Sequence, residues 1–224
     1  MLVGHVAVGL VAKRIEPRIS LGTGILAALF ADLAWCVFLI AGIEHVRIRP
    51  GMGAAHYFDA VDIAWSHSLL MDVVWAALFA AAYFARRRYA RGAAVLFAAV
   101  LSHWLLDFVS HGPDMPLAPG VNRYFGWGLW NSIPATVVVE GGFWLLAIIL
   151  YARATHPKGR AGFWAFWIVI AFLTLTWYNN VAGQPPNPRT MATGSLIFFS
   201  GIVAWGYWMD RQRVLASTPA ILKV

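Results

Sequence analysis

Long apolar runs, separated by short polar segments, occupy most of the chain. A helix needs about 20 consecutive apolar residues to cross the hydrocarbon core of a membrane. Runs of about this length lie at 21–43, 64–85, 92–110, 133–152, 162–181 and 191–209. A shorter run, 2–12, predicts a half-helix packed against the others. The pattern predicts an all-α, polytopic transmembrane bundle of about six spanning helices plus a short N-terminal helix, with residues 1–224 forming a single integral membrane domain.

The composition agrees with a membrane protein. Hydrophobic residues make up 60% of the chain and charged residues only 12%, whereas a soluble domain carries about 25% charged residues. The net charge of +7 would suggest nucleic-acid binding in a soluble domain, but the basic residues fall between the apolar runs, so we expect no nucleic-acid partner. The single Cys36 excludes an intramolecular disulfide and a cysteine-based zinc knuckle. Gly4-His5 stands where a cleavable signal peptide would carry basic residues, so we expect none.

The basic residues occupy alternate loops, which predicts the orientation of the helices. Lysines and arginines precede the first long run, lie in 86–91 and 153–160, and end the chain. The loops 44–63, 111–132 and 182–190 carry fewer of them. Because cytoplasmic loops are enriched in lysine and arginine, we expect the basic loops inside and the others outside.

Ionisable side chains inside the apolar runs point to a functional site. Such a residue costs about 2.5–3.5 kcal/mol near the centre of a span, so it normally has a partner or a function. The candidates are His5, Asp32, His67, His103, Asp107, His111 and Glu140. At 1.5 Å per helical residue, they lie within roughly 16 Å of the outer ends of their runs. We therefore expect one pocket in the outer half of the membrane.

The segment SHWLLDFVSH, residues 102–111, suggests that the pocket binds metal. Residues i and i+4 lie about 6 Å apart on one helix face, so His103 and Asp107 can bind the same ion. His103 and His111 are about 12 Å apart along the axis, which favours two ions bridged by Asp107, within a range of one to three. Imidazole and carboxylate ligands favour Zn²⁺ over Mn²⁺ or Fe²⁺. For any single residue, the alternative is a hydrogen-bonding role between helices.

At these positions the sequence resembles the YdjM-type family of bacterial inner-membrane proteins. The matching features are Gly4-His5, Asp32 in an early apolar run, SHS at 66–68, SHWLLD at 102–107 and the proline-rich GPDMPLAP after His111. The resemblance covers roughly the first 140 residues. It implies a multi-pass protein of the bacterial cytoplasmic (inner) membrane with metal-dependent hydrolase activity.

The order of the candidates is also similar to that of the ligands in secreted zinc-dependent phospholipases C. These enzymes carry a His, an Asp, a His, a His-x-x-x-Asp and a further His. The resemblance implies a zinc ion held by Asp32, His67, His103 and Asp107. It also implies a second ion with His5 and a bridging Asp107, and a further ion with His111.

The same enzymes carry a His-x-x-x-Glu near their end, where this chain has Thr136 and Glu140. Glu140 is therefore interpreted as a general base or as a carboxylate that supports a ligand, and Asp107 as the other catalytic residue. Metal ions lower the pKa of bound water and stabilise a phosphoester transition state.

The predicted function is a membrane-embedded, metal-dependent hydrolase. A pocket inside the bilayer suits a phosphoester in a lipid or lipid-linked substrate, so membrane lipids are the expected partners. One alternative is a proton or metal-ion transporter, because intramembrane His and Asp residues also mark ion pathways. The other is a structural membrane protein in which a metal ion joins helices.

Overall fold

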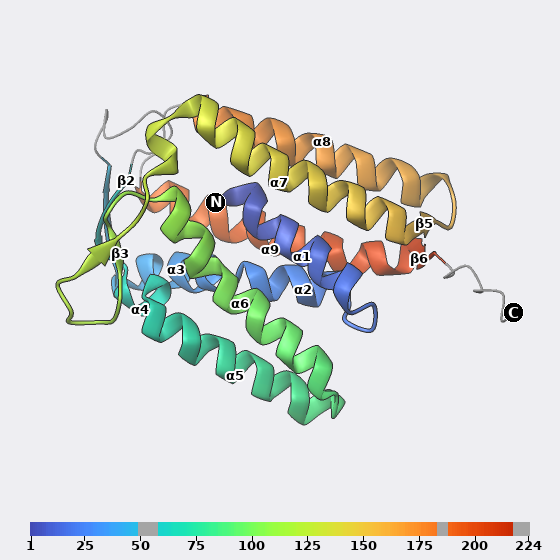
Figure 1. Cartoon of the computed structure of the whole chain (residues 1–224), viewed down its shortest axis with the longest axis horizontal. Coiled ribbons are helices and arrows are strands. Elements are labelled where there is room, and N and C mark those ends of the chain that lie inside the picture. Colours follow the sequence, from blue (N-terminus) through green and yellow to red (C-terminus); the bar gives the residue numbers. More distant parts are fainter. Residues whose placement is uncertain (49–57, 183–187, 217–224) are drawn as a thin grey trace, which may run out of the picture.

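The structure is a computed structural model that describes residues 1–48, 58–182 and 188–216 (Figure 1). The helices of these residues are, in order, α1 (Leu2–Ile15), α2 (Leu21–Ala28), α3 (Phe30–Ala41), α4 (Ala64–His67), α5 (Leu69–Arg87), α6 (Ala90–Ser110), α7 (Ile133–Ala154), α8 (Arg160–Ala182) and α9 (Pro188–Gln212). A short 3-10 helix, η1 (Leu129–Asn131), precedes α7. The predicted all-α bundle is confirmed.

Helices α5 to α9 are each long and apolar enough to cross a membrane, and α2 with α3 supplies one more span if the bent pair is counted as one. This agrees with the prediction of about six spans. Large apolar side chains cover the outside of the bundle: Val138 of α7 is 73% exposed and Ile197 of α9 is 70% exposed. Such a surface suits lipid, which is as apolar as these side chains.

Two of the predicted spans contain breaks. The run at 21–43 forms two helices that meet at Leu29 with a bend of 56°. The run at 64–85 begins with α4, a single turn, and α5 starts after Ser68. Ser68 has extended backbone angles and its side chain accepts a hydrogen bond from the Met71 N–H, so it caps α5. Both breaks lie beside candidate ligands, namely Asp32 and His67.

The short N-terminal run forms α1, which ends three residues later than predicted and packs against α2, α6 and α7. It lies among the longer helices (Figure 1). It approaches α2 closely, because a Cβ atom at Gly9 would lie 2.8 Å from the Cα atom of Ile25. Because only glycine permits this spacing, Gly9 sets how closely α1 approaches, and His5 lies one turn before it.

Short antiparallel strand pairs join ends of the helices. In the described residues, β1 (His45–Ile48) pairs with β2 (Phe58–Asp62), β3 (Met115–Pro116) with β4 (Tyr124–Phe125), and β5 (Thr155–Pro157) with β6 (Arg213–Leu215). Figure 1 shows β2 and β3 at one end of the bundle and β5 and β6 at the other. The main apolar core joins α1 to α7, α8 and α9, and a smaller cluster joins α2 to α5 and α6.

Candidate metal centre

Five of the predicted ligands come together from four helices. His5 comes from α1, Asp32 from α3, His67 from α4, and His103 and Asp107 from α6. The three imidazoles and the Asp107 carboxylate are buried, and Asp32 is partly buried. Two groups could each hold a metal ion, His5–His103–Asp107 and Asp32–His67–His103, with ligand atoms within 4.8 Å of one another. The groups share His103, so they form one continuous centre.

The distances around the two inner imidazoles match those of a metal site. The Nε2 atoms of His67 and His103 are 3.3 Å apart. Asp32 Oδ1 lies 3.6 Å from the Nε2 atom of His67 and 3.7 Å from that of His103. Asp107 Oδ2 lies 3.9 Å and 3.2 Å from the same two nitrogens. Ligands about 2.1 Å from a tetrahedral zinc ion are about 3.4 Å from one another, so these atoms are near the separations that one ion requires.

The bend between α2 and α3 orients the imidazole of His103. Its Nδ1 atom lies 2.8 Å from the carbonyl oxygen of Ala28, the last residue of α2. A carbonyl oxygen can only accept a hydrogen bond, so Nδ1 donates. In the neutral ring, Nε2 then carries a lone pair that points into the centre, which is the arrangement found around metal-binding histidines.

A buried glutamate that the sequence analysis missed orients His67 in the same way. Glu44 accepts hydrogen bonds from the Ser66 N–H at 2.7 Å and from the Ser66 hydroxyl at 2.6 Å. The Ser66 hydroxyl has one hydrogen, so its oxygen accepts from His67 Nδ1, 2.7 Å away. Glu44 lies beyond the end of α3, where burial raises the pKa of its carboxyl and the hydrogen bonds from Ser66 oppose that shift. In the sequence, Glu44 is an acidic residue directly after the apolar run 21–43. Such residues are common on protein surfaces, so this position alone does not indicate a role at the site.

These contacts leave two imidazole lone pairs facing each other. With both Nδ1 atoms protonated, the Nε2 atoms of His67 and His103 are 3.3 Å apart with no hydrogen between them in the neutral rings. Two carboxylates, Asp32 and Asp107, lie beside them. Lone pairs and negative charges at this spacing repel one another unless a proton or a cation lies among them. The donor set therefore fits a divalent metal ion with imidazole and carboxylate ligands.

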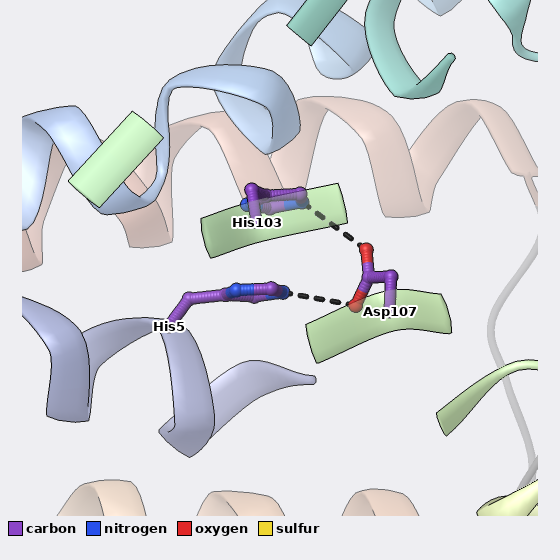
Figure 2. A group of neighbouring side chains, drawn as sticks. All are labelled: His5, His103 and Asp107. Atoms are coloured by element: carbon purple, nitrogen blue, oxygen red, sulfur yellow. Dashed lines mark hydrogen bonds and ion pairs between the residues drawn. The ribbon is translucent and has the colours of Figure 1, made fainter. Parts of the chain in front are cut away.

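Asp107 lies between His5 and the pair of imidazoles of His67 and His103, and uses a different oxygen toward each side. Figure 2 shows His5 and His103 approaching different oxygens of this carboxylate. His5 Nε2 lies 3.1 Å from Oδ1, whereas His103 Nε2 lies 3.2 Å from Oδ2. The two imidazoles stack with their ring centroids 3.7 Å apart. The Met1 amino group donates to the same Oδ1 at 2.8 Å, so this side of the carboxylate already accommodates a cation.

The remaining two candidates lie outside both groups. His111 follows the last residue of α6 and has extended backbone angles, so the helical spacing from Asp107 does not continue to it. Its Nδ1 lies 3.2 Å from Asp114 Oδ1 and its ring contacts Trp130. Glu140 of α7 is buried and interacts electrostatically with Asp107 and the Met1 amino group. Its Oε1 has no hydrogen-bond partner in the described part of the chain.

A family model described as YdjM inner membrane protein matches residues 1–183. The chain belongs to the YdjM inner membrane protein family. The match confirms the resemblance found in the sequence and includes every residue of the centre as well as Glu44 and Glu140. Together with the apolar helices, membership of the YdjM family identifies a membrane protein. No curated protein and no solved structure gave a match to the chain.

Proposed function

We propose that this YdjM family member is a membrane-embedded, metal-dependent hydrolase that acts on a phosphoester of a lipid or lipid-linked substrate. The observation that carries the proposal is the convergence of Asp32, His67, His103 and Asp107, with their facing nitrogens and carboxylates. A purely structural bundle would satisfy these buried groups with hydrogen bonds instead of placing like partial charges together.

We assign zinc to the centre, with Asp32, His67, His103 and Asp107 as the ligands of one ion. His103 has only Nε2 available, because Nδ1 donates to Ala28. A second ion would therefore rely on His5 and the other oxygen of Asp107. The Met1 amino group lies there, 3.1 Å from His5 Nε2 and 2.8 Å from Asp107 Oδ1. A second ion would displace this amino group, and the few protein ligands would then leave coordination positions for water and substrate, as catalytic sites require. A bound ion of this kind lowers the pKa of water and offsets the charge of a phosphoester in the transition state.

Glu140 is the residue we assign to proton transfer. Its buried Oε1 lacks a hydrogen-bond partner among the described residues, and its carboxylate lies near Asp107 without belonging to either ligand group. A carboxylate in this situation can accept a proton from water and return it to the leaving group. We expect Glu140→Gln to retain bound metal and to lower turnover by about 10²- to 10⁴-fold.

A lipid substrate is supported by where the centre lies in the bundle. His5 lies toward the start of α1, whereas Lys13 and Arg14 lie in its last turn. Asp107 lies toward the end of α6, and Arg91 lies near its start. Under the positive-inside rule the centre then lies toward the outer face, at the depth of headgroups and upper acyl chains. Apolar helix surfaces around it would let a lipid approach from the side.

The test combines metal analysis with a hydrolysis assay. Purified protein is expected to contain zinc. The variants His103→Ala and Asp107→Ala are expected to lose most of it, because each removes a ligand of the proposed ion. His156→Ala is the matched control, since His156 lies in β5 at the opposite end of the bundle. Metal-loaded protein should release phosphate esters from a panel of bacterial lipids, and a chelator should stop it.

Two outcomes would contradict the proposal. Wild-type metal content in both His103→Ala and Asp107→Ala would show that the centre does not hold the metal. Metal-loaded protein that hydrolyses no lipid in the panel, but carries protons or Zn²⁺ across liposome membranes, would identify a transporter instead.

A further inference from the structure

A cavity lies at the other end of the bundle from the candidate metal centre. It has a volume of about 280 Å³ and lies where β5 meets β6, at the right-hand end of Figure 1. The charged residues that line it are Lys13, Lys158, Asp210 and Arg213. None of these residues takes part in the proposed hydrolysis, so the cavity needs an explanation of its own.

Arg213 is the unusual residue of this cavity, because its guanidinium is buried and has no counter-charge among the described residues. The residue is 8% exposed. Of the five N–H groups of a guanidinium, one donates to the Thr155 hydroxyl at 2.9 Å and one to the Thr155 carbonyl at 3.0 Å. The other N–H groups have no acceptor, and no carboxylate lies within ion-pair distance, in the described part of the chain. The guanidinium also lies over the ring of Phe166, 4.7 Å from its centroid, which holds it in place.

Among the described residues that line the cavity, the one carboxylate, Asp210, is already neutralised. Asp210 Oδ1 lies 3.0 Å from Lys13 Nζ. Its Oδ2 accepts a hydrogen bond from the Leu21 N–H at the start of α2. Lys13 in turn donates to the carbonyl oxygens of Pro17 and Ile19. Asp210 and Lys13 therefore offset each other, and Arg213 and Lys158 leave the cavity with a positive charge.

We propose that this cavity binds a phosphate group, with Arg213 and Lys158 as the residues that recognise it. The unused N–H groups of Arg213 can form paired, charge-assisted hydrogen bonds to phosphate oxygens. Lys158 is exposed at the mouth and adds a mobile positive charge. Basic pockets between helices at a membrane face bind the phosphates of anionic lipid headgroups. The same chemistry accepts inorganic phosphate, so the source is decided by the experiment below.

The experiment measures binding to the purified full chain in detergent by calorimetry. The probes are short-chain phosphatidylglycerol, inorganic phosphate, and a short-chain diacylglycerol that lacks phosphate. All titrations contain a chelator, so that the metal centre does not contribute. We expect phosphatidylglycerol, inorganic phosphate or both to bind, and diacylglycerol not to bind. Binding of phosphatidylglycerol alone identifies a headgroup, and binding of inorganic phosphate alone identifies the free ion.

Variants separate this cavity from the general basic surface. Lys158→Ala and Arg213→Gln are each expected to weaken phosphate binding by about tenfold, the value of one charged hydrogen bond. The matched control is Arg160→Gln with Arg211→Gln, because both arginines are exposed at the same end of the bundle and neither lines the cavity. Lys158 is exposed, so its variant should fold even if Arg213→Gln does not. Equal weakening by the control pair, or no binding of either phosphate probe, would overturn the proposal.

Discussion

Glu44 shows how a residue outside the apolar runs can control a ligand inside them. Its carboxylate accepts both the N–H and the hydroxyl of Ser66, which forces the Ser66 oxygen to accept from His67. The free Nε2 of His67 thus depends on a residue 22 positions before Ser66. Residues that orient metal-binding histidines are expected to influence metal affinity nearly as much as the ligands do.

The first prediction concerns this contact. Glu44→Gln should weaken zinc affinity by about 10- to 100-fold. The two Ser66 hydrogens are accepted by different oxygens of Glu44, whereas glutamine has one oxygen, and its NH₂ group competes for the Ser66 oxygen. Zinc affinity is measured by competition with a chromophoric chelator. Asp62→Asn is the control, because Asp62 is an exposed acid in the paired strand β2. An affinity unchanged in Glu44→Gln would show that Glu44 does not hold the His67 ring.

At the scale of helices, the centre depends on how closely α1 packs and on where α2 ends. Gly9 allows α1 to approach α2, and the bend at Leu29 leaves the Ala28 carbonyl free for His103. Neither feature is visible in the hydrophobic pattern. The bend has no proline at its centre, so the sequence predicts a continuous run there.

The second prediction tests the packing of α1. Gly9→Ala places a Cβ atom 2.6 Å from a side-chain carbon of Ile25 and 2.8 Å from its Cα atom. Overpacking of this kind costs about 1–3 kcal/mol, so the midpoint of thermal unfolding in detergent should fall. Zinc affinity should fall with it, because the displaced His5 ring stacks on the ligand His103. Gly142→Ala is the matched control, because nothing lies within 4 Å of a Cβ atom there. Equal stability of the two variants would contradict the close packing.

The third prediction concerns the loop that joins α1 to α2. In this loop, Glu16 contacts the start of α6. Its carboxylate lies 3.0 Å from Arg91 Nε of α6 and accepts from the Arg18 N–H. A hydrogen bond from Tyr89 is the main reason that the pKa of Glu16 is lower than its usual 4.5. A lowered folded-state pKa means that the contribution is complete above the unfolded-state pKa and is lost as pH falls through the folded-state pKa.

Glu16→Gln should therefore be less stable than the wild type at pH 7, and the difference should shrink as the pH falls below about 4.5. Thermal unfolding of both proteins at several pH values measures this difference. Comparing the two at each pH cancels the protonation of the metal ligands, which affects both equally. A difference that stays constant down to strong acid would show that Glu16 contributes no charge-dependent stability.

At the scale of the whole molecule, the bundle has two chemically different ends. One end carries the metal centre that we propose, and the other carries the basic loops and the proposed phosphate-binding cavity (Figure 1). A large part of the surface between them is apolar, with Val138, Leu145 and Ile168 exposed by more than half. The function proposed for each end depends on which side of the membrane it faces.

The fourth prediction is that the metal centre faces outward. In a Cys36→Ser background, a cysteine at Pro119 should react with a membrane-impermeant thiol reagent in intact cells, and a cysteine at Arg88 should not. The reason is that Arg88 lies in the basic turn between α5 and α6, whereas Pro119 lies between β3 and β4. Both sites should react after the membrane is permeabilised. Labelling of Arg88→Cys alone in intact cells would reverse the orientation and place the metal centre at the inner face.

The sequence by itself determined the helices and the pairing of His103 with Asp107. An apolar run in lipid must satisfy its own backbone groups, so it becomes a helix whatever surrounds it, and residues four apart on that helix share a face. It also indicated His5, Asp32 and His67, because charge inside an apolar run is costly. The estimated depths of these residues also predicted that they share one pocket. Only the tertiary structure decided which of them meet: it separated His111 and Glu140 from both ligand groups and added Glu44. Those outcomes depend on contacts between residues distant in sequence and on backbone breaks at Leu29, Ser68 and His111, which neither hydrophobic length nor helical spacing encodes.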